Sequence, residues 1–260
     1  MVRRRNDSLK ALPVSAGLHV VGAGSGWIAV EKPPGISVHN DPGMDACAMA
    51  ARLVARSPGL AQRIGCLTPV RFFPVHRLDQ ATSGLLLLAC RRAAAQQLSD
   101  CFRNHQVRKS YVALVVGRFD PRCGRRWGVW DAPLSNRSSG RRRPSGYPPR
   151  RAAVTRYRVW GHAGGCTLIE CRPETGRIHQ IRRHACMAGH PVVGDRRYGS
   201  VILADRLAEA IGCYYHALHC RSLVIPLPGG AIRLRTRRMP ERFRRLVDAV
   251  GPADCSDQPC

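Results

Sequence analysis

Short apolar segments separated by turn residues predict several strands along the chain. They are rich in β-branched or alternating apolar residues, and they lie at 18–21, 27–30, 85–88, 110–117, 154–160, 166–171, 223–225 and 232–234. Apolar residues recur at helical spacing in 45–56 and 91–105. A third helix is expected at about 177–188 with Thr175 as its cap, and a last one from Pro240.

These elements do not alternate as regular β-α-β units, so they predict an α+β fold with a mixed, mainly antiparallel central sheet flanked by helices. The 260 residues, 44% of them hydrophobic, suffice for one substantial core over residues 17–250, with tails at 1–16 and 251–260. Residues 118–151 contain three consecutive arginines and several prolines, which indicates a long basic loop. Two interpretations of this loop stay open: it orders on a nucleic acid, or it is solvated and has no role.

The charge of the chain is far from balanced. Its 42 Lys and Arg residues exceed its 17 Asp and Glu residues, which gives a net charge of +25. Nearly all of this charge is arginine, whose planar guanidinium donates two parallel hydrogen bonds to phosphate. A genome that favours arginine codons could supply part of the excess without any binding partner. The composition therefore supports nucleic-acid binding without establishing it.

No segment is typical of a membrane span, a secretion signal or a metal site. The most apolar run, residues 84–90, is far shorter than a membrane helix, and no apolar segment follows the N-terminal arginines. The twelve cysteines are scattered without a Cys-x-x-Cys pair. We therefore expect a cytoplasmic protein with reduced cysteines and no bound metal.

Five blocks of sequence resemble one enzyme family. The block from His76 to Leu88 reads His-Arg-Leu-Asp-Gln-Ala-Thr-Ser-Gly-Leu-Leu-Leu-Leu and resembles the signature of the RluA family of RNA pseudouridine synthases. The other blocks lie at 31–39, 109–115, 173–199 and 216–217, and all five are in the order expected for the family. Together they span about residues 18–250, so the resemblance implies a pseudouridine synthase catalytic domain that acts on RNA. About 17 residues precede the first strand, which is too few for the S4-type domain of many relatives.

The implied reaction fits a single carboxylate. Conversion of uridine to pseudouridine breaks the C1′–N1 bond, turns the base and rejoins it through C5, so it needs no cofactor. A glycosidase normally uses two carboxylates. Here Asp79 has no second acid in its block. Two routes remain open, because Asp79 could attack C1′ of the ribose or remove a proton from C2′.

The resemblance also assigns partners to Asp79. Arg182 is expected to pair with Asp79 and keep it ionised in a closed site, although composition alone would make it a surface arginine. Tyr111 is expected to stack on the base, and its hydroxyl to assist proton removal at C5; the alternative is an ordinary core aromatic. The target uridine must be flipped out of the RNA to reach them. RNA contacts are expected from Arg77, which helps to hold the flipped arrangement, and from Lys109, Arg177 and Arg183.

Structural roles are expected for the other polar residues of these blocks: His76, Thr82, Ser83, Gly84, His179, His184, His190 and Asp195. Ser83 has no recognisable His-Asp partnership, which argues against a serine hydrolase. His179 and His184 are five positions apart on a probable helix, which argues against a metal site. The rival interpretation is a non-catalytic RNA-binding or ribosome-assembly protein on the same fold, and a metal-dependent nuclease lacks a carboxylate cluster. The RNA target, ribosomal or transfer RNA, stays open, and we expect a monomer.

Overall fold

The computed structural model describes residues 17–66, 69–118, 127–137, 139–163, 165–211, 214–236, 240, 241 and 243. In chain order its elements are β1 (His19–Gly24), β2 (Trp27–Lys32), α1 (Ala46–Ala55), α2 (Pro58–Ile64), β3 (Phe73–Pro74), β4 (Ser83–Ala89), α3 (Arg92–Arg103), β5 (Arg108–Val116), β6 (Gly128–Trp130), β7 (Leu134–Ser135), β8 (Arg150–Arg151), β9 (Thr155–Ala163), β10 (Cys166–Pro173), α4 (Gln180–Met187), α5 (Val201–Ile211), β11 (Leu218–Leu227) and β12 (Gly230–Arg235).

One large sheet organises the described part of the chain. Its main order is β1-β2-β4-β11-β5-β10-β9-β6, with β12 added to β11 and β3 added to β4. Every pairing is antiparallel except that of β11 with β4, which is parallel over two register pairs. The predicted α+β fold with a mixed, mainly antiparallel sheet is confirmed.

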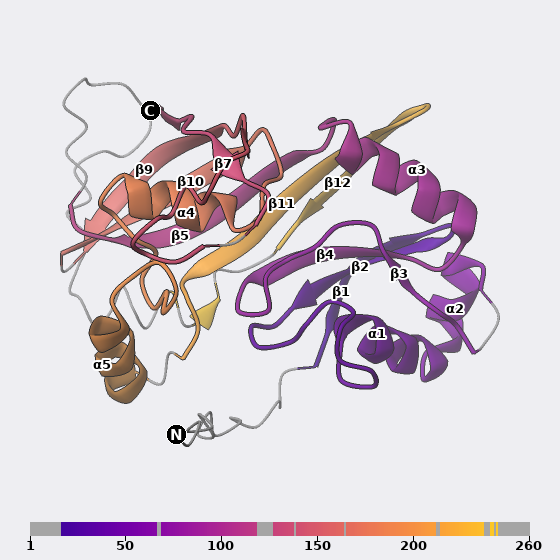
Figure 1. Cartoon of the computed structure of the whole chain (residues 1–260). Coiled ribbons are helices and arrows are strands. Elements are labelled where there is room, and N and C mark those ends of the chain that lie inside the picture. Colours follow the sequence, from indigo (N-terminus) through magenta and orange to yellow (C-terminus); the bar gives the residue numbers. More distant parts are fainter. Residues whose placement is uncertain are drawn as a thin grey trace, which may run out of the picture.

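Two apolar cores form on the two halves of this sheet. The first core joins β1, β2 and β4 to α1, α2 and α3, and the second joins β5, β9 and β10 to α4. Figure 1 shows the same division, with α1–α3 grouped around the N-terminal strands and α4 beside β9 and β10. Because β11 lies between β4 and β5, it connects the two halves. The candidate catalytic residues flank this connection.

Local sequence explains the elements nearest the site. All seven residues of β4 are buried, as expected for the apolar run that the sequence predicts as a strand. Gly84 in β4 has a φ of 110°, and a Cβ atom there would lie 2.2 Å from the backbone oxygen of Cys220 in β11. Only glycine therefore allows the close parallel contact between β4 and β11.

The structure corrects several expectations about secondary structure. Residues 127–137 and 139–151 are not an irregular loop, because β6 pairs with β9 and β7 pairs with β8. The aromatic ring of Trp130 stacks on that of Tyr157 at 4.5 Å, which anchors this segment to the sheet. Residues 119–126 of the expected loop, both tails and most of the helix expected from Pro240 lie outside the described residues.

Helices also differ from the expectation. The helix predicted at 177–188 begins only at Gln180, and Thr175 does not cap it; its hydroxyl donates to the Gln180 side chain and accepts from the Val154 N–H. The patterns did not predict α2 or α5. In the described ranges, no helix is both long enough and apolar enough to cross a membrane.

Candidate active site

Asp79 lies in the loop that leads into β4, and backbone contacts hold this loop in place. The backbone oxygen of Asp79 accepts from Thr82 N–H at 3.0 Å. The oxygen of Gln80 accepts from Gly35 N–H at 2.9 Å and from the ammonium of Lys32 at 3.0 Å. Lys32 is fully buried, and its ammonium also donates to two backbone oxygens of the Pro33–Ile36 turn. Lys32 thus ties the Asp79 loop to the Pro33–Ile36 turn.

Two histidines support the start of β4. One of them lies in β11 and the other lies just before β11. The Thr82 hydroxyl lies 2.8 Å from Nε2 of His216, and the Ser83 hydroxyl lies 2.8 Å from Nδ1 of His219. Ser83 therefore does have a histidine partner, which the sequence did not reveal. The other ring nitrogen of His219 faces the hydroxyl of Thr236, not a carboxylate. This buried group supports the loop and is not a hydrolase triad.

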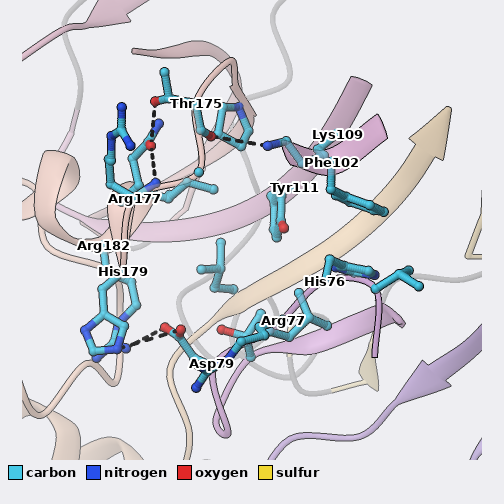
Figure 2. A pocket seen from close by; sticks show the side chains of 18 of the residues that line it. His76, Arg77, Asp79, Phe102, Lys109, Tyr111, Thr175, Arg177, His179 and Arg182 are labelled. Carbon is cyan, nitrogen blue, oxygen red and sulfur yellow. Dashed lines mark hydrogen bonds and ion pairs between the residues drawn. The ribbon is translucent and has the colours of Figure 1, made fainter. Parts of the chain in front are cut away.

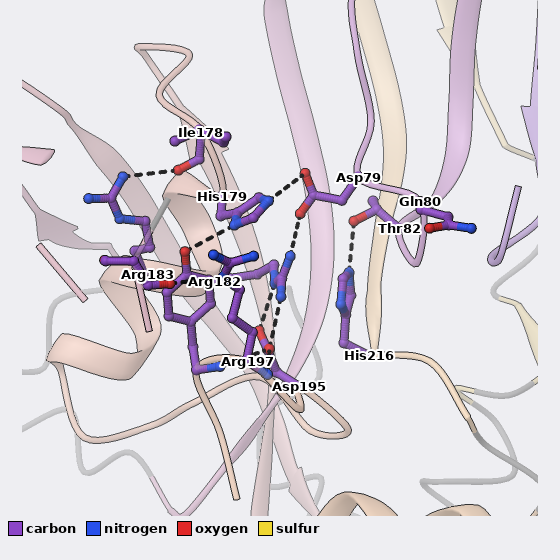
Figure 3. Close-up of polar contacts among 12 residues, drawn as sticks. Asp79, Gln80, Thr82, Ile178, His179, Arg182, Arg183, Asp195, Arg197 and His216 are labelled. Carbon is purple, nitrogen blue, oxygen red and sulfur yellow. Dashed lines mark hydrogen bonds and ion pairs between the residues drawn. The ribbon is translucent and has the colours of Figure 1, made fainter. Parts of the chain in front are cut away.

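Arg182 bridges Asp79 and Asp195, as Figure 3 shows. Its Nη1 donates to Oδ2 of Asp79 at 2.7 Å, and its Nε and Nη2 donate to the Asp195 carboxylate at 2.6 and 2.9 Å. The Arg182 side chain is 8% exposed and that of Asp195 is 0% exposed. Two carboxylates thus offset the cost of burying one guanidinium, and the pairing expected between Arg182 and Asp79 is present.

The arginine decides the charge of the carboxylate. Burial raises the pKa of Asp79. The charge of Arg182, with smaller contributions from His179 and His216, lowers the pKa by more than burial raises it, so the pKa lies below its usual value. The pKa of Asp195 is lowered in the same way, with burial opposed by the hydrogen bonds from Arg182. Asp79 is therefore ionised at neutral pH although it is only 26% exposed.

Asp195 also organises the turn beneath the site. Its Oδ1 accepts from the backbone N–H groups of Arg197 and Tyr198, each at 3.0 Å. The Arg182 guanidinium lies over the ring of Tyr198, with 5.1 Å between its carbon and the ring centre. The turn from Gly194 to Gly199 thus holds the carboxylate that pairs with Arg182.

A cavity of about 490 Å³ lies beside Asp79 and contains Tyr111 (Figure 2). Apolar groups from Phe102, Ile181 and Leu218 line it together with the Tyr111 ring. Burial, the neighbouring Cys220 and the Asp79 charge raise the pKa of the Tyr111 hydroxyl well above its usual value. The cavity therefore offers an aromatic, largely apolar wall that faces one ionised carboxylate.

A second, more polar cavity of about 840 Å³ adjoins the first. The two cavities share seven lining residues, which are Arg77, Leu78, Asp79, Gly176, Arg177, His179 and Arg182. Arg77 is exposed, and Arg177 is half-buried with its Nε donating to the Ala152 oxygen at 3.0 Å. Asp79 thus lies where a more apolar cavity meets a polar one, with Arg77, Arg177 and Arg182 at the junction.

The other two residues expected to bind RNA behave differently from each other. Lys109 lines the smaller cavity and donates to the Thr175 oxygen at 3.2 Å; burial lowers its pKa. Arg183 is fully buried, and its guanidinium donates to oxygens of Ser135, Pro144, Ser145 and Ile178. The structure contradicts the expectation that Arg183 contacts RNA, because its side chain is buried and four of its five donor contacts fasten residues 135, 144 and 145 to α4.

Three further histidines of the sequence blocks, His76, His184 and His190, make structural contacts. His76 accepts from the Leu87 N–H at 3.0 Å and stacks on Phe102 at 4.5 Å, and burial lowers its pKa to about 3. His184 bonds to the Thr155 hydroxyl and the Ala132 oxygen, and His190 bonds to the Val116 oxygen. Across the described ranges, no three His, Cys, Asp or Glu side chains are grouped to hold a metal ion.

The chain matches a known protein family over more than half of its length. The profile of the RNA pseudouridylate synthase family matches residues 26–186, which include Asp79, Tyr111 and Arg182. The chain belongs to this family. The resemblance to RNA pseudouridine synthases seen in the sequence is thereby confirmed.

Several proteins named as pseudouridine synthases are similar to this chain. The chain is 32% identical to ribosomal large subunit pseudouridine synthase D of Xanthomonas campestris over 248 residues, which cover 92% of this chain and 71% of that protein. It is 36% identical to the dual-specificity RNA pseudouridine synthase RluA of Haemophilus ducreyi over 60% of this chain and 68% of that protein. An uncharacterized RNA pseudouridine synthase of Chloroflexus aurantiacus is 42% identical over 65% of this chain and 50% of that protein. The chain thus spans about half to 71% of the length of these pseudouridine synthases.

Solved structures show the same fold. Human RNA pseudouridylate synthase domain containing 1 superposes with a TM-score of 0.66 at 25% identity over 94% of this chain and 97% of that one. Human RNA pseudouridylate synthase domain containing 4 superposes with a TM-score of 0.69 at 23% identity over 89% of this chain and 92% of that one. The two-lobed sheet described above is therefore the pseudouridine synthase fold.

Proposed function

We propose that this chain isomerises specific uridines of structured RNA to pseudouridine, with Asp79 as the reacting carboxylate. The observation that carries the proposal is the ion pair between Asp79 and Arg182 at the junction of the two cavities. An ionised carboxylate suits either open route, since both attack at C1′ and proton removal at C2′ need an unprotonated oxygen. The rearrangement transfers no group and changes no oxidation state, so the proposal requires no cofactor.

The two cavities suit different parts of the substrate. The smaller one has a volume within the usual range for small-molecule sites, and its Tyr111 ring provides a stacking surface for a flipped uracil. The larger polar cavity, with Arg77 and Arg177 at the junction, suits the flanking RNA backbone. In this arrangement Arg77 helps to hold the flipped nucleotide, and Lys109 adds positive charge beside the base.

Tyr111 is assigned mainly to stacking. Its raised pKa means that the hydroxyl keeps its proton at neutral pH, so it is a poor base in the resting enzyme. Its hydroxyl can take part in removing the C5 proton only by passing its own proton on. This favours contact with the base as its main contribution.

Ribosomal or transfer RNA is the proposed target. The relative from Xanthomonas campestris is named for the ribosomal large subunit, and the relative from Haemophilus ducreyi is named for dual specificity. A net charge of +25 fits a large folded polyanion of this kind. We expect the protein to act in the cytoplasm and as a monomer.

The decisive experiment compares Asp79→Asn with the wild type and with Asp41→Asn. Asp41 lines the larger cavity, so Asp41→Asn loses a carboxylate close to the site without touching the ion pair. Pseudouridine is mapped in RNA from the source cells after deletion of the gene and complementation with each variant. We expect one or a few sites to disappear in the deletion, to return with the wild type and Asp41→Asn, and to stay absent with Asp79→Asn.

The same experiment separates the enzyme from the rival interpretation. A non-catalytic RNA-binding or ribosome-assembly protein would leave the pseudouridine map unchanged in the deletion. It would also keep its RNA affinity in Asp79→Asn, because the substitution removes a negative charge. Restored modification with Asp79→Asn would show that another group performs the chemistry.

A further inference from the structure

His179 has a backbone conformation that is uncommon outside glycine. Its φ of 51° and ψ of 29° are left-handed, and it lies directly before α4. A side chain at a left-handed residue comes close to the following carbonyl oxygen, so residues other than glycine rarely adopt this conformation. Such strain persists where the surroundings enforce it, and it concentrates at functional sites. In this conformation the imidazole of His179 lies beside the carboxylate of Asp79 (Figure 3).

The hydroxyl of Tyr198 bonds to one ring nitrogen of His179. It lies 3.0 Å from Nδ1, and the two rings meet edge to face at 73°. The other ring nitrogen, Nε2, faces the ionised carboxylate of Asp79, which can only accept a hydrogen bond. This favours the tautomer with its hydrogen on Nε2, in which the Tyr198 hydroxyl donates to Nδ1. Nδ1 is then an acceptor, and Nε2 carries the hydrogen.

The two oxygens of Asp79 have different surroundings. Oδ2 accepts from Arg182 at 2.7 Å. Oδ1 lies 3.7 Å from Nε2 of His179, which is longer than a hydrogen bond. Oδ2 is thus fixed in an ion pair, whereas Oδ1 faces a neutral N–H group at a distance that leaves its lone pairs accessible.

We propose that His179 is a positioning residue for Asp79, held by Tyr198 as the neutral Nε2–H tautomer so that Oδ1 is the oxygen that reacts with the ribose. A neutral N–H orients the carboxylate without neutralising it. A protonated imidazole would form a second ion pair with Asp79 and weaken it as a base or nucleophile. This inference rests on the proposed function and adds a tautomer and a reacting oxygen to it.

The charges around His179 agree with a neutral ring. Burial lowers its pKa most, Asp79 and Asp195 raise it, and Arg182 and Arg197 lower it, so that the pKa lies below its usual value. Protonation at Nδ1 would also have to displace the proton of the Tyr198 hydroxyl from that nitrogen. Two cations and one hydroxyl therefore oppose the charged form at neutral pH.

Two variants test the proposal. His179→Asn keeps a residue that tolerates the left-handed backbone but is too short to place an N–H at the position of Nε2. Tyr198→Phe keeps the ring and removes the hydroxyl that bonds to Nδ1. Tyr147→Phe is the matched control, since Tyr147 is 68% exposed in the segment of residues 139–151. The assay measures kcat, KM and their pH dependence on a modifiable RNA, with folding checked by denaturant unfolding.

We expect His179→Asn to lower kcat by roughly 10- to 100-fold while KM changes less than twofold, in line with the usual size of such contributions. In Tyr198→Phe, Nδ1 is released to take a proton, so the acidic limb of the pH–rate profile should move to higher pH. Wild-type kcat and pH profile in both variants would overturn the proposal, and so would an effect on KM alone. If the wild type itself forms no pseudouridine, the proposed function fails instead.

Discussion

Arg183 allows a sharp test of how the insertion, meaning residues 127–137 and 139–151, is attached to α4. Its guanidinium makes five donor contacts, of 2.5–3.2 Å, to oxygens of Ser135, Pro144, Ser145 and Ile178. The Arg183→Met substitution keeps an unbranched side chain but removes every donor, so several buried oxygens lose a partner. Hydrogen bonds to charged groups contribute about 1.5–3 kcal/mol each, and the oxygens share these contacts. We expect a loss of roughly 3–5 kcal/mol in the free energy of unfolding.

Chemical denaturation and limited proteolysis measure this loss in complementary ways. A decrease of this size lowers the melting temperature by about 10 °C in a domain of this length. If the insertion detaches alone, new cleavage sites should instead appear within residues 139–151 at an unchanged unfolding midpoint. Arg142→Met is the control, because Arg142 is exposed on the same insertion and carries the same charge.

An Arg183→Met variant that matches Arg142→Met in both measurements would refute this stabilising role of Arg183. That outcome would mean that the buried contacts contribute no net stability and that water or neighbouring donors replace them. A loss of RNA binding with unchanged stability and proteolysis would restore the original expectation that Arg183 contacts RNA.

Two further predictions concern Asp195 and Gly84. Folding lowers the pKa of Asp195, so its stabilising contribution is present above its unfolded value of about 4 and is lost as pH falls through the lower folded value. The difference in unfolding midpoint between wild type and Asp195→Asn should therefore be large at pH 7 and shrink below pH 4; a constant difference would contradict the ion pair with Arg182. Gly84→Ala should destabilise the fold by at least about 2 kcal/mol more than Gly43→Ala, because a Cβ at Gly84 meets the Cys220 backbone and one at Gly43 meets nothing within 4 Å. Equal losses in denaturant unfolding would show that β11 can move away.

Elements with strong periodicity could be predicted from the sequence, and weakly patterned ones could not. The apolar run of β4 and the amphipathic α3 lie within about three residues of the predicted positions. The insertion was misjudged because its apolar anchors, Trp130 and Leu134, are isolated among arginines and prolines. Its main polar support, Arg183, lies far along the chain, so no local pattern could reveal it.

The candidate site shows the same limit. Motifs indicated Asp79, Tyr111 and Arg182, and the structure places all three around one cavity. The motifs did not show that Lys32 ties the Asp79 loop to its neighbour, since its partners are backbone oxygens brought together only by the fold. His179 was expected to be merely structural, because spacing on a helix cannot indicate that its backbone is left-handed.

The position of β11 has a consequence for when the site forms. The ribosome makes β4 and β5 well before β11, and among the described strands β11 is the one that pairs with both of them. Asp79 precedes β4, whereas Arg182 belongs to the half that contains β5. A nascent chain that lacks β11 thus contains both partners of the ion pair without a common frame to bring them together. The ion pair between Asp79 and Arg182 therefore depends on a strand that is made after both of its partners, so during synthesis it is expected to form only once β11 has paired.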